Sequence, residues 1–286
     1  MKEKESHFFL NIVILIVILI TVIFFYAKYV GIKGIKVKEY KVESSILSKN
    51  FSGLKIVHFS DLLYKSTISD EDVDELVEKI NILKPDIVVF TGDLINKNIK
   101  ATDEEKKLLI EKLSNIKASI DKYAISGDYD YEYEYDDIMQ QSGFIVLNND
   151  YEEIFYKENE SIYLVGLPSS IKENINLNEA FKFYNDNDRK YIIVLVHDGN
   201  TIKYIDESNY EVDLILGGHS LNGSVVIPFY GGLFKDKYTY KYSNEYYSKG
   251  ITNIYISSGL GTNQYKYRFN NKPSFNFYRL KSLKNK

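Results

Sequence analysis

The sequence predicts an α/β domain that follows one N-terminal transmembrane helix. Three observations support this fold class: a long apolar run near the N-terminus, five short β-branched runs that each lead to Asp or His, and amphipathic segments between some of them. About 250 residues follow the apolar run, which is enough for one domain with a substantial core. Because no Pro-rich or Gly-rich linker divides these residues, we expect a single domain.

The apolar run extends from Phe8 to Ala27 and is interrupted only by Asn11 and Thr21. A helix of this length spans a hydrocarbon core of about 30 Å at about 1.5 Å per residue. A cleaved signal peptide is the competing interpretation, but the run is longer than a usual signal core and no small-residue cleavage pattern follows it. A buried core helix fits such a run least well. The predicted segments are a tail at 1–7, the transmembrane helix at 8–27, a juxtamembrane segment with a first strand at 28–54, and the domain at 55–286.

Five apolar runs have the length and β-branched character of buried strands. They occupy residues 55–60, 86–90, 122–125, 191–196 and 213–216. Each leads to a side chain that can bind a metal, in the order Asp61, Asp93, Asp128, His197 and His219. In open α/β sheets, ligands gather at the carboxyl ends of the strands. We therefore expect three carboxylates and two imidazoles around one crevice.

Two amphipathic segments predict helices between the first three of these strands. One begins at Asp70 with three acidic residues and continues to Ile82, before Pro85, and the second extends from Asp103 to Ile120. An acidic first turn and a following proline are typical helix boundaries. The later half is richer in strand-like runs, at 144–147, 162–165, 225–227 and 251–257.

The order and local sequence of these segments resemble the calcineurin-like metallophosphoesterases, in particular a membrane-associated bacterial branch that includes phosphodiesterases for lipid-linked or nucleotide-type substrates. The family's blocks are D-x-H, G-D-x-x-D, G-N-H-[DE], a lone H and G-H-x-H. The matching residues here are Asp61-Leu62-Leu63, Gly92-Asp93-Leu94-Ile95-Asn96, Gly127-Asp128-Tyr129-Asp130, His197 and Gly218-His219-Ser220-Leu221. The resemblance implies the family's four-layer αββα sandwich of two packed sheets.

The same resemblance implies that only one of two metal sites is retained. In the family, one metal is held at positions that correspond here to Asp61, Leu63, Asp93 and Leu221, so that two imidazoles are replaced by leucine. The other metal is implied at Asp93, Asp128, His197 and His219, all of which can coordinate. Two carboxylates and two imidazoles suit Mn, Zn or Fe. We therefore expect one divalent metal.

Two further positions depart from the family's pattern. The histidine that the family uses beside the leaving group is Tyr129 here, and a phenol with an ordinary pKa near 10 is a poorer proton donor at neutral pH. The second block ends in a carboxylate in the family, and the residue at this position here is Asn96. An asparagine can orient a ligand by hydrogen bonding but adds no charge. Asp61 and Asn96 are therefore expected to act as a residual ligand or as supports for the ligands.

A purely structural interpretation competes with metal binding. Asp61 and Asp93 are residue types favoured where a strand turns into a loop, and His219 could lie in a turn without binding anything. The joint pattern favours a metal, because two of only four histidines fall at ligand positions of one site.

For the tract 129–137, in which Tyr alternates with Asp or Glu, we expect a solvated loop that leads into an acidic helix start; a lid over the metal is the alternative.

Composition and charge restrict partners and location. There are no cysteines, which excludes disulfides and thiolate metal sites, and a net charge of -4 without a basic stripe argues against nucleic acid. Lysines are more numerous after the apolar run than before it, which would place the domain in the cytoplasm. The family resemblance implies the opposite side. We expect a single-pass protein of the cell membrane, anchored in the bilayer, with its domain on the extracytoplasmic face.

Two functional classes remain after this reasoning. The first is a membrane-anchored hydrolase with one metal that cleaves a phosphodiester or pyrophosphate of a lipid or nucleotide. The second is a catalytically inactive pseudo-phosphoesterase that serves as a binding or scaffold module. Because the apolar run is expected to contribute nothing to the core, deletion of residues 1–30 should release a folded domain. No motif identifies the natural substrate or the oligomeric state.

Overall fold

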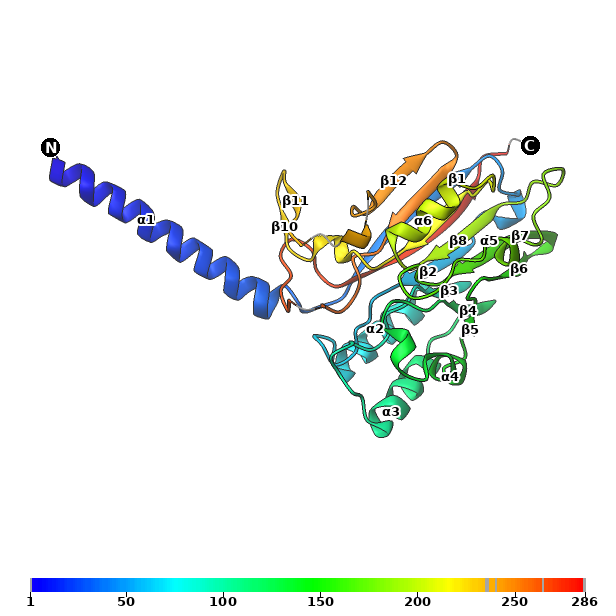
Figure 1. Ribbon diagram of the computed structural model, residues 1–286, viewed down its shortest axis with the longest axis horizontal. Coiled ribbons are helices and arrows are strands. Elements are labelled where there is room, and N and C mark those ends of the chain that lie inside the picture. The colour runs from blue at the N-terminus through cyan, green and yellow to red at the C-terminus, as the bar shows by residue number, and fades with distance from the viewer. Residues whose placement is uncertain (1, 235–236, 240, 264, 285–286) are drawn as a thin grey trace.

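The computed structural model describes residues 2–234, 237–239, 241–263 and 265–284, with the side chains of the first helix described from His7 onward. This helix, α1 (Lys2–Phe25), continues as a short π-helix, η1 (Tyr26–Val30). It stands away from the domain (Figure 1), and its apolar stretch is not buried by the rest of the protein. The expected N-terminal apolar helix is therefore present, and it is long and apolar enough to cross a membrane.

The domain contains two six-stranded sheets. The first has the order β1 (Lys36–Ser44), β14 (Ser274–Ser282), β2 (Lys55–Phe59), β3 (Ile87–Phe90), β4 (Asp121–Ala124) and β5 (Ile145–Val146). The second has the order β12 (Tyr246–Lys249), β13 (Thr252–Ile256), β9 (Leu214–Gly217), β8 (Ile192–Val196), β7 (Glu158–Leu167) and β6 (Asp150–Tyr156). Neighbouring strands are parallel except for the β14–β2, β12–β13 and β6–β7 pairs.

Helices cover the outer face of each sheet. Those on the first sheet are α2 (Asp70–Leu83), α3 (Asp103–Ser114) and α4 (Tyr135–Gln141), and those on the second are α5 (Leu177–Ala180) and α6 (Gly199–Asp206). Three buried apolar clusters correspond to the three interfaces between layers: helices on the first sheet, sheet on sheet, and second sheet on helices. The expected four-layer αββα sandwich is therefore confirmed.

The helix boundaries follow the local sequence, with one correction. Ser69 and Thr102 cap α2 and α3, and in each case a carboxylate three residues later completes a capping box. The expected helix from Asp103 to Ile120 ends at Ser114, because the Ser119 and Ile120 amides donate instead to the carbonyls of Pro85 and Asp86. These bonds extend the pairing of β4 with β3.

Short elements complete the domain. They are the 3₁₀ turns η2 (Lys49–Phe51), η3 (Asp130–Glu132), η4 (Leu221–Gly223) and η5 (Lys237–Thr239), and a small hairpin formed by β10 (Val226–Ile227) and β11 (Gly231–Gly232). The hairpin projects from the domain beside the end of α1 (Figure 1). The loops after β2, β3, β4, β8 and β9 are the ones that carry the five metal-capable side chains.

Candidate metal centre

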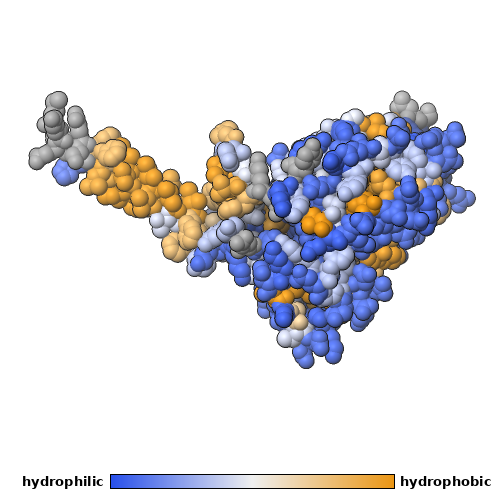
Figure 2. All heavy atoms as spheres, in the orientation of Figure 1, coloured by the Kyte–Doolittle hydropathy of each residue, from blue (hydrophilic) through white to orange (hydrophobic). Residues whose placement is uncertain are grey.

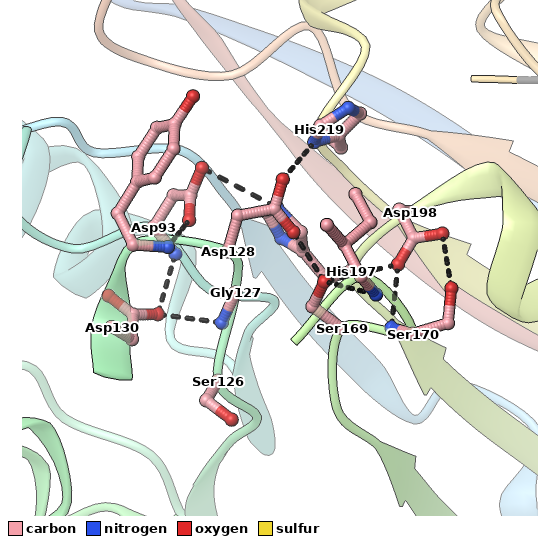
Figure 3. Close-up of polar contacts among 12 residues, drawn as sticks. Asp93, Ser126, Gly127, Asp128, Asp130, Ser169, Ser170, His197, Asp198 and His219 are labelled. Atoms are coloured by element: carbon pink, nitrogen blue, oxygen red, sulfur yellow. Dashed lines mark hydrogen bonds and ion pairs between the residues drawn. The ribbon is translucent and has the colours of Figure 1, made fainter. Parts of the chain in front are cut away.

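Four side chains from four strand ends meet between the two sheets (Figure 3). Asp93 follows β3, Asp128 follows β4, His197 follows β8 directly and His219 follows β9. One ligand atom each from Asp93, His197 and His219 lies within 4.8 Å of the others. Asp128 joins this cluster, because its carboxylate lies 3.2 Å from His219 Nδ1 and 3.8 Å from His197 Nε2. This spacing suits a single cation between the four side chains.

The orientation of His197 is fixed by the backbone. Its Nδ1 lies 2.7 Å from the carbonyl oxygen of Thr91, and a carbonyl only accepts, so Nδ1 carries the hydrogen. The other ring nitrogen, Nε2, is then the one that is free to coordinate a metal. It is fully buried, has no hydrogen-bond partner among the described residues, and lies 3.5 Å from Asp93 Oδ2. A histidine whose second nitrogen is held by a carbonyl is the arrangement found in metal ligands.

His219 supplies a second buried nitrogen without a partner. Its Nδ1 is within hydrogen-bonding distance of Asp128, while its Nε2 is buried and unpaired among the described residues. A buried polar atom without a partner is costly in free energy unless an ion or water satisfies it. The two unpaired imidazole nitrogens and the adjacent carboxylates therefore fit a divalent cation.

The electrostatics of the cluster favour added positive charge. Burial opposes ionisation of Asp128, but His219, His197 and the hydroxyl of Ser169 outweigh it and hold the pKa of that carboxyl below its ordinary value. Burial likewise opposes protonation of His197, but Asp93, Asp128 and Asp61 raise its pKa well above the ordinary value. The carboxylates therefore create a local potential that stabilises a cation.

Asp130 holds the two carboxylate loops together, a role that the sequence reasoning missed. Its side chain accepts hydrogen bonds from the amides of Asp93 at 2.8 Å, Leu94 at 2.9 Å and Gly127 at 2.7 Å, and from the Tyr133 hydroxyl. Burial and the nearby Asp93 raise its pKa to about 6. The acidic last position of the third block was the available signal.

Asp61 lies on the side of the centre where this chain has leucine at the two positions that are histidine in the family pattern. It is buried and accepts hydrogen bonds from Ser60 Oγ at 2.6 Å and from the His219 amide at 3.1 Å. Burial raises its pKa, although His197 opposes the shift. Leu63 and Leu221 are both buried beside it, packed against Gly261 and Gly259. Around Asp61 the centre is therefore apolar where the family pattern would have two further ligands.

The backbone of these loops is strained. Asp61, Leu63, Asp93, His219 and Leu221 all adopt positive φ angles, between 46° and 65°. Such conformations are unfavourable for residues other than glycine and concentrate at functional sites. The loops are therefore strained at Leu63 and Leu221 as well as at the candidate ligands.

A cavity of about 390 Å³ opens from the centre. Tyr129 and His219 lie in its wall, with Lys97 and Asn263 beside them. The Tyr129 amide donates to Asp93 Oδ1 at 3.0 Å, and its hydroxyl lies 2.7 Å from Asn263 Nδ2. Burial, helped by the nearby carboxylates, raises the pKa of the phenol. Tyr129 is therefore a fixed, protonated hydroxyl at the cavity.

The structure differs in part from what the sequence predicts for Asn96 and for the tract 129–137. Asn96 is buried, but its described hydrogen bonds involve the Thr262 carbonyl and the Asn98 amide rather than a side chain of the centre. The tract 129–137 leads into an acidic helix start as expected, since α4 begins at Tyr135 and has Asp136 and Asp137 in its first turn, but Asp130 and Tyr135 are buried rather than solvated. These two side chains bond to the loops after β3 and β4, which draws the tract onto the domain.

Comparisons with known proteins agree with this geometry. Residues 54–223, which include all four clustered side chains, match the family profile described as calcineurin-like phosphoesterase. The uncharacterized metallophosphoesterase YkuE of Bacillus subtilis (strain 168) is 31% identical over 261 residues, which cover 90% of this chain and 89% of that protein.

Two further relatives have membrane or lipid terms in their names. UDP-2,3-diacylglucosamine pyrophosphatase LpxG of Chlamydia muridarum is 26% identical over 275 residues, covering 75% of this chain and 81% of that protein. A transmembrane protein with metallophosphoesterase domain from Danio rerio is 23% identical over 220 residues, covering 70% of this chain and 49% of that protein.

Proposed function

Because this chain belongs to the calcineurin-like phosphoesterases, a family that uses divalent metals, we propose that it is a membrane-anchored hydrolase of a phosphodiester or pyrophosphate. The proposed metal ligands are Asp93, Asp128, His197 and His219, with Mn, Zn or Fe as the ion. When bound, such an ion supplies positive charge to the phosphoryl oxygens and lowers the pKa of a bound water. The buried, unpaired Nε2 of His197 is the observation that supports this proposal most directly.

The side chains around the cavity suit a phosphoryl group. Lys97 lies at the cavity with its ammonium 4.8 Å from the centre of the Tyr129 ring, so it can offer positive charge to a phosphate. Tyr129 is positioned to donate a hydrogen bond to a substrate oxygen. Its raised pKa makes it a weak proton donor to a leaving group. We therefore expect Tyr129 to orient the substrate more than to transfer a proton.

A lipid-linked substrate is favoured over a soluble nucleotide. Leu233, Phe234 and Tyr265 line the cavity together with polar side chains such as Lys97 and Asn263. A phosphoester with an apolar portion fits this mixed lining better than a nucleotide alone. The name of the LpxG relative assigns a diacylated pyrophosphate substrate to that protein. The extracytoplasmic location expected from the sequence remains part of this proposal.

An inactive binding module is the second candidate. The observation that favours it is the pair of buried leucines, Leu63 and Leu221, at positions where the resemblance implies imidazoles. Loss of a second metal removes part of the charge stabilisation of an in-line displacement. The retained cluster around His197 speaks for the hydrolase, since a scaffold would have no need of unpaired buried nitrogens.

Metal analysis of the full chain, purified in detergent, tests the proposal. We expect about one tightly bound transition metal per chain, because one full ligand set is retained, and His219→Ala should abolish it. His7→Ala, which changes an exposed histidine far from the centre, is the control. Hydrolysis of bis(p-nitrophenyl) phosphate should be lost when the metal is removed by a chelator and should return with added Mn, Zn or Fe. Two metals per chain would show that Asp61 and other residues rebuild a second site. Failure to bind metal or to hydrolyse would favour the scaffold.

A further inference from the structure

The β10–β11 hairpin exposes large apolar side chains at its tip. The side chain of Phe229 is fully exposed, and Tyr230 and Ile227 are 70% and 40% exposed. Residues 221–234 contain no charged side chain, although 27% of the whole chain is charged. A contiguous, uncharged apolar projection of this kind is rare on soluble proteins and marks a surface that contacts a partner or a membrane.

The hairpin is fixed beside the end of the apolar helix. The backbone of Phe269 bonds to the hairpin, accepting from the Val226 amide at 2.9 Å and donating to the Ser224 carbonyl at 3.2 Å. The adjacent Arg268 amide donates to the Ala27 carbonyl at 3.0 Å, within η1. One short segment therefore holds both the base of the hairpin and the end of the helix.

The figures show that the hairpin and the apolar helix α1 lie on the same side of the domain. The hairpin lies on the side of the domain from which α1 departs (Figure 1). Apolar atoms of the hairpin and of the helix lie close to each other on the face drawn in Figure 2, whereas most of the domain surface around them is hydrophilic. If α1 crosses a bilayer, the hairpin is on the side of the domain that faces this bilayer. Aromatic side chains such as Phe229 and Tyr230 are enriched at the interface between membrane and water.

The same hairpin leads to the candidate metal centre. Ser224, before β10, and Leu233 and Phe234, after β11, line the cavity that contains His219. Phe234 also stacks on Tyr265, with ring centres 4.8 Å apart, and both rings lie in the cavity wall. The segments on both sides of the hairpin therefore contribute residues to the cavity wall.

We propose that the β10–β11 hairpin inserts its tip into the leaflet beside α1 and holds the mouth of the cavity at the level of the lipid headgroups. The occupant of this surface is the bilayer itself. Resting on the proposed hydrolase function, this geometry also defines the substrate class: a phosphoester lipid whose acyl chains stay in the membrane while its headgroup enters the cavity. A water-soluble phosphoester would gain nothing from the hairpin.

Tryptophan fluorescence tests the insertion directly, because the chain contains no tryptophan. Phe229→Trp gives the full chain a single tryptophan, which is excited selectively over the tyrosines in vesicles of phosphatidylcholine and phosphatidylglycerol. We expect blue-shifted emission and strong quenching by lipids brominated on the acyl chains. The matched control is Phe155→Trp on β6, an exposed position, 54% accessible, on a strand far from α1. It should emit as in water and escape quenching.

Two results would overturn the insertion. Emission from Phe229→Trp that equals the control would place the tip in water. A blue shift without quenching by brominated lipid would mean that a protein surface, such as a second copy of the chain, covers the tip. Neither result depends on whether the protein hydrolyses anything, so insertion and the proposed function fail separately.

Activity measurements test the substrate class. Phe229→Asp should lower hydrolysis of a phosphodiester lipid embedded in vesicles by about tenfold or more, because a charge at the tip opposes insertion. Hydrolysis of bis(p-nitrophenyl) phosphate should stay within about twofold, since Phe229 does not line the cavity. Phe155→Asp is the control for both substrates. Equal loss on the two substrates, or no loss on either, would overturn the lipid assignment. An unmodified chain that is inactive on both would refute the proposed function on which that assignment rests.

Discussion

Leu63 and Leu221 set the chemistry of the centre more than any other residues. Both are buried next to Asp61, and both keep positive φ angles, of 46° and 47°. A leucine gains nothing from the left-handed conformation, which costs on the order of 1 kcal/mol or more for a residue with a Cβ. The backbone at both leucines therefore has the same left-handed conformation as the backbone at the candidate ligands Asp93 and His219.

Restoring imidazoles at both positions is expected to rebuild a second metal site. Leu63→His together with Leu221→His would supply two nitrogens beside Asp61 and Asp93, and a second metal about 3.5–4 Å from the first would stabilise both oxygens of the displacement. Metal content should rise towards two per chain and phosphodiester hydrolysis should accelerate. Each single variant should gain little, because one imidazole leaves the site short of a ligand.

Leu62→His is the matched control, since Leu62 is equally buried but packs into the cluster between the first sheet and its helices. This control variant should lower the stability of the domain and should not increase its metal content. If the double variant binds two metals and hydrolyses no faster, the second metal does not limit the rate. Tyr129 would then be the limiting residue, and addition of Tyr129→His to the double variant would decide the question.

At the scale of elements, Arg268 connects the anchor to the centre. Its fully buried guanidinium donates to the carbonyls of Ser258, Gly259 and Gly261, which lie in the loop that packs against Asp61. Burial lowers its pKa to about 10, opposed by Asp61, so it stays charged at neutral pH. Because its backbone amide also donates to the Ala27 carbonyl, Arg268 contacts both the helix end and this loop.

Arg268→Lys should destabilise the domain even though the charge is retained. An ammonium on a flexible stem cannot reproduce the planar set of donors that reaches several carbonyls. Disruption of a buried charged network costs about 3–5 kcal/mol, which for a domain of this size corresponds to roughly 10 °C in Tm. Thermal unfolding in detergent, followed by circular dichroism, measures the loss. Arg279→Lys, on the exposed face of β14, is the control and should shift Tm little. A similar shift for both variants would contradict a special role for Arg268.

Across the whole molecule, the sequence predicted what depends on local pattern. Strand runs, helix starts and the order of Asp93, Asp128, His197 and His219 are local features, and the structure brings these four side chains together. Asp130 escaped notice because its role depends on amides from two separate loops. The hairpin escaped notice for a similar reason. Its short apolar run reads as an ordinary strand until the contacts of Phe269 place it beside the helix.

The contacts between Arg268 and the end of the apolar helix determine how much of the N-terminus can be deleted without loss of stability. The sequence alone predicts that deletion of residues 1–30 releases a folded domain. In the structure, Ala27 and Gly31 are buried, and the Gly31 backbone packs tightly against the Arg268 carbonyl. A cut after Phe24 keeps these contacts, whereas a cut after Val30 removes part of them. We therefore expect the shorter deletion to yield the more stable domain, as measured by thermal unfolding. Equal Tm values for the two truncations would show that Ala27 contributes no stability.

The domain that lacks residues 1–24 should still associate with vesicles, weakly and reversibly, through the hairpin. Because residues 221–234 carry no charge, this association should persist in high salt, unlike binding through surface lysines. Sedimentation with phosphatidylcholine and phosphatidylglycerol vesicles at low and high salt measures it. Phe229→Asp should abolish the salt-resistant fraction, and Phe155→Asp should leave it unchanged. Complete release from vesicles at every salt concentration would mean that the hairpin cannot hold the membrane alone, and that α1 must first bring it to the bilayer surface.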